Sequence, residues 1–186
     1  MVLGIEHIWG GVDHLLFVLA LLLIVKGLRR VILTITAFTV AHSITLAAAT
    51  LGYVHVPGAP VEAAIALSIV FVAAEIVHGL QGRPGLTARA PWIVAFTFGL
   101  LHGFGFAGAL AEVGLPQHAI PVALLFFNVG VELGQLLFVG AVALVVRALG
   151  EARMTWPRWS EAVPAYAIGT VAMFWVIQRV LDFATY

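Results

Sequence analysis

The stretch Gly99-Leu100-Leu101-His102-Gly103-Phe104-Gly105-Phe106-Ala107 places one histidine, flanked by glycines, near the middle of a long apolar run. An imidazole at bilayer depth costs free energy unless it has a hydrogen-bond partner or faces water. Gly99 and Gly103 form a small-xxx-small spacing that lets a neighbouring helix come close, and Gly105 and Gly108 extend this surface. We therefore expect a tightly packed helix that directs His102 into the protein interior.

The composition of the whole chain is that of an integral membrane protein. Of its 186 residues, 62% are hydrophobic and only 10% are charged, whereas soluble domains carry about 25% charged residues. The apolar runs are ~20 residues long, which indicates transmembrane helices rather than alternating strands. The 9 basic and 9 acidic residues balance, so nothing in the net charge indicates nucleic acid as a partner.

The residue types that are scarce exclude several chemistries. The chain has no cysteine and only 3 methionines. Disulfides, thiolate catalysis and soft-metal sites built on cysteine are therefore excluded, and a methionine-lined copper(I) path is disfavoured. The first residues lack the basic region and the cleavage site of an intact signal peptide.

Six spans fit the apolar runs, so we expect one transmembrane domain over residues 1–186, an all-α bundle of six helices. Proline and glycine separate the spans, as at Pro57, Pro60 and Pro84. The predicted helices cover residues 5–25, 31–51, 61–80, 92–112, 119–146 and 161–181.

The basic residues predict the orientation of this bundle. Three of the five connections hold Lys26, Arg29, Arg30, Arg83, Arg89, Arg147, Arg153 and Arg158. The positive-inside rule makes the connections after the first, third and fifth helices cytoplasmic and places the N-terminus outside. Arg179 is the exception, and we expect it to snorkel or to lie near the outer boundary.

Polar residues recur near mid-depth of the first five predicted helices. Asn128, Glu132 and Gln135 are spaced i, i+4 and i+7, so they share one helix face. The earlier helices contribute Asp13, His14, His42, Ser68 and His102, and His7 lies one heptad before His14. The sixth helix carries only Gln178 and Thr170 among such groups, which predicts a packing role.

Each polar residue taken alone has a structural explanation as an interhelical hydrogen-bond partner. Taken together, unrelated ionisable groups at one depth on separate helices would each be costly. Imidazole and carboxylate are the usual ligands of divalent nickel, cobalt, zinc and iron, and the ligand types do not choose among these metals. The residues that could hold a metal are Asp13, His14, His42, His102 and Glu132, with Ser43, Thr45, Asn128 and Gln135 as residues that could orient them.

These motifs, in this order, resemble the HupE/UreJ family of bacterial membrane proteins. The similar segments are residues 7–17, with a histidine, five residues and then Asp-His, and residues 37–46, 61–62 with 65–69, 98–107 and 127–135. The resemblance implies nickel or cobalt entry for hydrogenase and urease maturation. It implies His7, Asp13 and His14 as the metal-handling set, with His42, Glu132 and His102 as companions. The chain departs from the family pattern at Glu75, where we expect an asparagine, and in lacking the signal peptide of many members.

The leading hypothesis is transport of a divalent metal ion, nickel or cobalt, through a bacterial inner membrane. The ion would enter past His7 and Glu62 and leave toward Glu75 and His78. It would bind near mid-depth among Asp13, His14, His42, His102 and Glu132, with Ser68 as a further residue around the ligands or along the pathway. The alternative is a membrane-embedded zinc hydrolase or other metalloenzyme that uses the same cluster. No Gly-x-Ser-x-Gly or His-Glu-x-x-His motif is present, which favours transport. A metal that only ties helices together is a third reading, and the small-residue helix faces could also join copies of the chain.

Overall fold

The computed structural model describes residues 1–106, 119–151 and 157–184, and all regular structure in these ranges is helical. This confirms the all-α prediction for the described part of the chain. The helices, in chain order, are α1 (Val2–Gly10), α2 (Val12–Ile24), α3 (Leu28–Thr50), α4 (Gly58–Leu80), α5 (Leu86–Arg89), α6 (Pro91–Gly105), α8 (Ile120–Glu151), the 3-10 helix η2 (Arg158–Ala162) and α9 (Val163–Ala184).

The long helices make the chain a multi-pass membrane protein. Within the described ranges, four helical stretches are long and apolar enough to cross a bilayer, namely Leu28–Thr50, Gly58–Leu80, Ile120–Leu149 and Trp159–Ala184. A fifth is added if α1 and α2 count as one bent span. The described part of the span predicted at 92–112 is α6, with 15 residues, and residues 107–112 lie outside the described ranges. The sixth span therefore stays a prediction.

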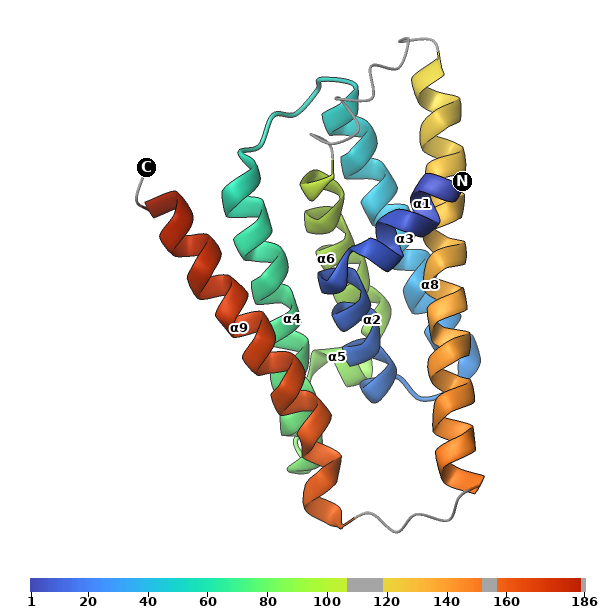
Figure 1. The fold of residues 1–186 in the computed structure, drawn as a ribbon, viewed down its shortest axis with the longest axis vertical. Coiled ribbons are helices and arrows are strands. Elements are labelled where there is room, and N and C mark those ends of the chain that lie inside the picture. The colour runs from blue at the N-terminus through green and yellow to red at the C-terminus, as the bar shows by residue number, and fades with distance from the viewer. Residues whose placement is uncertain (107–118, 152–156, 185–186) are drawn as a thin grey trace.

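The first predicted span, 5–25, is not one straight helix. It breaks at Gly11, and α1 is bent by 78° from α2, so that α1 crosses α8 instead of continuing the line of α2 (Figure 1). Gly11 is extended, with φ −86° and ψ 90°, and a Cβ atom there would lie 2.9 Å from His14 Nδ1 and from the His7 carbonyl oxygen. A side chain at Gly11 would therefore press on both helices at the bend.

Glycines set the two closest helix contacts. A Cβ atom on Gly99 would lie 2.6 Å from the Phe38 carbonyl oxygen, and one on Gly103 would meet the carbonyl oxygen of His42. This confirms the predicted close approach of a helix at Gly99 and Gly103, and the helix is α3. Gly4 and Gly130 bring α1 equally close to α8. These glycine faces thus pack within one chain.

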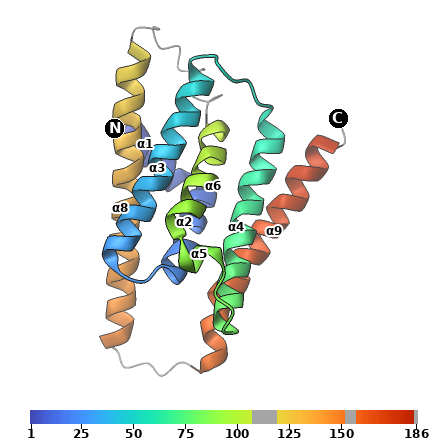
Figure 2. The same cartoon turned by 180° about the vertical axis from the view of Figure 1, so that it is seen from behind.

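The other long helices pack around α2. Figures 1 and 2 show α2 inside the bundle, with α3, α6 and α4 around it and α9 lying along α4 on the outside. The largest apolar core joins α2, α3, α4, α6 and α9 and includes Phe17, Phe38, Ile69 and Ile168. The links after α2 and α4 and the C-terminal end of α8 lie at the lower end of Figure 1.

Candidate metal centre

Three histidines from three helices meet inside the bundle. One ring nitrogen from each of His7, His14 and His42 lies within 4.8 Å of the other two. Residues seven apart on a straight helix are separated by roughly 10 Å along its axis, yet the ring centroids of His7 and His14 are 4.7 Å apart. The bend at Gly11 therefore brings them together, and α3 supplies His42.

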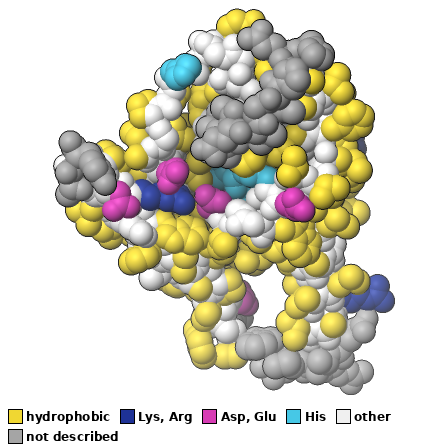
Figure 3. Space-filling view, turned by 45° about the horizontal axis from the view of Figure 1, so that its top comes forward, with side chains coloured by type: hydrophobic (Ala, Val, Ile, Leu, Met, Phe, Trp, Pro, Cys, Tyr) yellow, Lys and Arg dark blue, Asp and Glu magenta, His cyan; other side chains and the backbone are white. Residues whose placement is uncertain are grey.

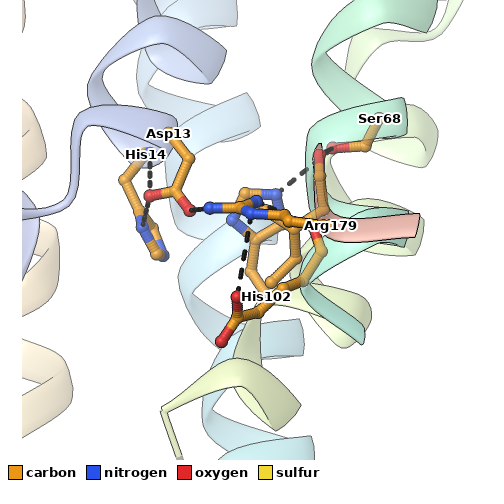
Figure 4. A network of polar contacts seen from close by, with 7 residues as sticks. Asp13, His14, Ser68, His102 and Arg179 are labelled. Atoms are coloured by element: carbon orange, nitrogen blue, oxygen red, sulfur yellow. Dashed lines mark hydrogen bonds and ion pairs between the residues drawn. The ribbon is translucent and has the colours of Figure 1, made fainter. Parts of the chain in front are cut away.

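Asp13 holds the ring of His14 in one orientation. Its Oδ1 atom accepts a hydrogen bond from the backbone N–H of His14 at 2.9 Å and lies 3.1 Å from His14 Nδ1 (Figure 4). A carboxylate accepts and does not donate, so Nδ1 carries the proton and Nε2 carries the free lone pair. A histidine that ligates a metal through one ring nitrogen commonly donates its other ring N–H to a carboxylate in this way.

Asn128 does the same for His42. The Asn128 side-chain N–H donates to the Leu124 carbonyl at 2.8 Å, which leaves its oxygen facing His42 Nδ1 at 3.4 Å. An amide oxygen only accepts, so the proton again lies on Nδ1 and the lone pair on Nε2.

His102 has the opposite tautomer. The Ser68 hydroxyl donates to the Ile65 carbonyl at 2.6 Å, so its oxygen accepts from His102 Nε2 at 3.3 Å (Figure 4). The lone pair then lies on Nδ1. The His102 ring is fully buried, and its centroid is 4.8 Å from that of His14.

In His14, His42 and His102, the ring nitrogen that carries the free lone pair is also the one without a hydrogen-bond partner. Among the described residues, Nε2 of His7, His14 and His42 and Nδ1 of His102 are buried without a hydrogen bond. Buried polar side-chain atoms are normally paired. Four unpartnered imidazole nitrogens, three of them on rings oriented by acceptors, are a donor set suited to a borderline divalent metal.

A cavity of about 200 Å³ opens beside this cluster. In the space-filling view, histidine side chains lie in a hollow with acidic and basic side chains beside it (Figure 3). Phenylalanine rings pack on the imidazoles, with Phe106 4.1 Å from His7 and Phe38 5.1 Å from His102 between centroids. The cavity is lined by His7, Gly11, Asp13, His14, Glu62, Ile65, His102, Gly105, Phe106 and Arg179.

Arg179 is the residue of this site that sequence reasoning missed. It lies on α9, and its guanidinium is 3.6 Å from Asp13 Oδ2 and 3.7 Å from Glu62 Oε2. An arginine within the last predicted span was the available signal, because an intramembrane charge usually has a functional partner. The prediction that this helix only packs is therefore incomplete.

Glu132 lies outside the cluster. Its carboxylate accepts a hydrogen bond of 2.6 Å from the Thr36 hydroxyl, and Gln135 accepts one of 3.1 Å from Thr39. With His42 and Asn128, these pairs form a polar seam between α3 and α8, which was predicted as one polar face of α8.

The other predicted residues divide between the cavity and the rest of the bundle. Glu62 lines the cavity. Ser43 and Thr45 bond to backbone carbonyls of their own helix. Glu75 accepts from the Thr87 backbone N–H at 2.8 Å and so anchors α5, and His78 is exposed in the last turn of α4.

Comparison with protein families gives a match to the family described as HupE / UreJ protein, over residues 1–179. The chain belongs to the HupE/UreJ family. Membership agrees with a membrane protein that handles a divalent metal, and the match ends at Arg179, so it includes every residue of the cavity. Searches of curated proteins and of solved structures return no significant match.

Proposed function

We propose that this HupE/UreJ protein transports a divalent transition metal ion, nickel or cobalt, across a bacterial inner membrane. One observation carries the proposal: among the described residues, His7, His14 and His42 bring ring nitrogens within 4.8 Å of one another, and each ring has a buried nitrogen without a hydrogen-bond partner. The ring of His102, which also has such a nitrogen, lies 4.8 Å from that of His14 between centroids. The ion would be the cargo, held by His7, His14, His42 and His102, with Asp13 supporting His14 from behind.

This set of ligands favours reversible binding of a metal ion. The imidazoles are supplied without a thiolate, and the two carboxylates in the cavity, Asp13 and Glu62, already face Arg179. A transport site has to bind strongly enough to admit the ion and weakly enough to release it. Imidazole ligands beside two carboxylates that share one guanidinium are consistent with both demands.

The basic residues support one orientation of the protein in the membrane. At one end of the bundle, Lys26 and Arg83 lie in the links after α2 and α4, Arg29 and Arg30 in the first turn of α3, Arg89 in α5 and Arg147 near the end of α8. We assign this end to the cytoplasm by the positive-inside rule. The cavity then opens toward the outer side, where Glu62 near the start of α4 would meet the ion first. Glu75 and His78 remain candidates for the exit.

The metalloenzyme alternative needs a carboxylate free to act as a base on a metal-bound water. Asp13 is bonded to His14 and paired with Arg179, Glu62 is paired with Arg179, and Glu132 is bonded to Thr36. None of these carboxylates is free in the described structure. We therefore adopt transport.

The test measures metal binding and metal uptake side by side. Purified protein is dialysed against Ni²⁺ or Co²⁺, and cells that express the same variants are assayed for nickel accumulation. His14→Ala should weaken binding by about tenfold or more and lower uptake with it. His55→Ala, which removes an exposed histidine from the link before α4, should change neither.

Two results would refute the proposal. One is wild-type protein that binds neither Ni²⁺ nor Co²⁺ and does not raise cellular nickel. The other is stoichiometric zinc that does not exchange, with uptake unaffected by His14→Ala, because such a metal ties helices together and is not carried.

A further inference from the structure

Arg179 brings a permanent positive charge to the cavity from the last helix. Its Nη1 atom donates to the Glu62 carbonyl oxygen at 2.8 Å, while its side chain faces both Glu62 and Asp13. Its Cζ atom lies 5.7 Å from the ring centre of Trp175, one turn earlier on α9. A guanidinium does not lose its proton in proteins, so this charge is always present.

Among the described residues, the charged groups that line the cavity are two carboxylates and this one guanidinium. Asp13 uses Oδ1 for His14 and presents Oδ2 to Arg179 (Figure 4). A metal ion that approaches the histidines through the cavity would meet the carboxylates of Asp13 and Glu62 first. Arg179 therefore lies beside the first negative charges on this path.

The geometry of these ion pairs is loose. The two guanidinium–carboxylate distances are 3.6 and 3.7 Å, whereas strong charge-assisted hydrogen bonds are about 2.7–2.9 Å long. The short contact is the one to a neutral backbone carbonyl. The carboxylates can therefore be taken over by another cation while Arg179 keeps its anchor on α4.

We propose that Arg179 is a competitor of the metal ion for the carboxylates of Asp13 and Glu62. Its guanidinium pairs with these carboxylates until the ion arrives and pairs with them again when the ion leaves. This positioning role rests on the proposed transport function. It keeps the affinity of the histidine cluster low enough for release, since the positive charge opposes a dication in a partly buried site. A structural role, in which Arg179 fixes Asp13 so that Asp13 can orient His14, predicts the opposite effect on affinity.

The test is the dissociation constant of Co²⁺ and Ni²⁺ for purified Arg179→Gln beside wild type. Removing the opposing charge should tighten binding by about tenfold or more, because like charges a few ångströms apart repel even where water screens them. Arg179→Lys keeps the charge and should bind like wild type. Arg30→Gln removes an exposed charge at the start of α3 and should have no effect.

Uptake kinetics give a second readout that a structural role would not produce. Arg179→Gln should lower KM and also lower the maximal rate, because the ion is bound more tightly and released more slowly. Weaker or unchanged binding in Arg179→Gln overturns the competitor role, as does tightening in Arg179→Lys equal to that in Arg179→Gln. If wild type and Arg179→Gln both bind no metal, the transport proposal fails as well, whereas binding by wild type without tightening in Arg179→Gln overturns the competitor role alone.

Discussion

At the scale of single residues, the candidate centre depends on oxygen atoms that accept a hydrogen bond from a histidine ring. Asp13, the Asn128 carbonyl and the Ser68 oxygen each face one nitrogen of a histidine and so decide which nitrogen stays free. None of these three residues needs to touch a metal ion. Their effect is to point the lone pairs of His14, His42 and His102 inward.

Asn128→Leu should weaken Ni²⁺ binding by about tenfold or more, because His42 loses the acceptor that fixes its tautomer and ring orientation. Gln135→Leu is the matched control, since it removes another buried amide from the same seam between α3 and α8. Both variants should lower the melting temperature in detergent, and only Asn128→Leu should change the dissociation constant. Equal affinities in the two variants would show that the hydrogen bond to His42 does not matter.

At the scale of elements, the break between α1 and α2 builds the histidine cluster. Gly11→Ala would place a methyl group 2.9 Å from His14 Nδ1 and 3.3 Å from Asp13 Oδ1, so the oriented pair must shift. We expect Co²⁺ binding to weaken at least several-fold. Gly10→Ala, at a neighbouring position with open space around it, should bind Co²⁺ as wild type does. Loss of binding in both variants would assign the effect to the helix break as a whole.

The contact of α6 with α3 is a second property of the elements. Gly103→Ala forces a methyl group against backbone and should lower the free energy of unfolding by about 1–3 kcal/mol. Gly140→Ala lies in α8 where no atom is within 4 Å, and alanine there should be neutral or stabilising by up to about 1 kcal/mol. Thermal unfolding in detergent compares the two. A neutral Gly103→Ala would mean that α6 can withdraw from α3 without loss.

At the scale of the whole molecule, the orientation can be tested directly because the chain has no cysteine. Tyr53→Cys and Gln81→Cys place single thiols at exposed positions after α3 and after α4. A membrane-impermeant maleimide should label Tyr53→Cys in intact cells and Gln81→Cys only after the membrane is opened. The reverse pattern would invert the topology, and with it the side from which the ion enters.

The sequence predicted the helical class, four of the spans, the close packing at Gly99 and Gly103, and the histidines that meet. It did not predict the bend at Gly11, because an apolar run of span length reads the same whether its helix is straight or broken. The sequence shows the depth of Glu132 along its helix but not its partner Thr36, and Glu132 was therefore grouped with the histidines. It left Arg179 out because only the packing of α9 on α4 carries that side chain to Asp13.

The unpartnered donor atoms of the centre are all imidazole nitrogens, and this has a consequence for the chemical environments in which the protein can work. Thiolate sites lose their ligands when an oxidant converts sulfur to sulfenic acid or disulfide. The centre described here holds no sulfur, and Met173 on α9 is largely exposed on the outside of the bundle. The same ligand set is therefore kept under oxidising and reducing conditions, on either side of a membrane that separates the two.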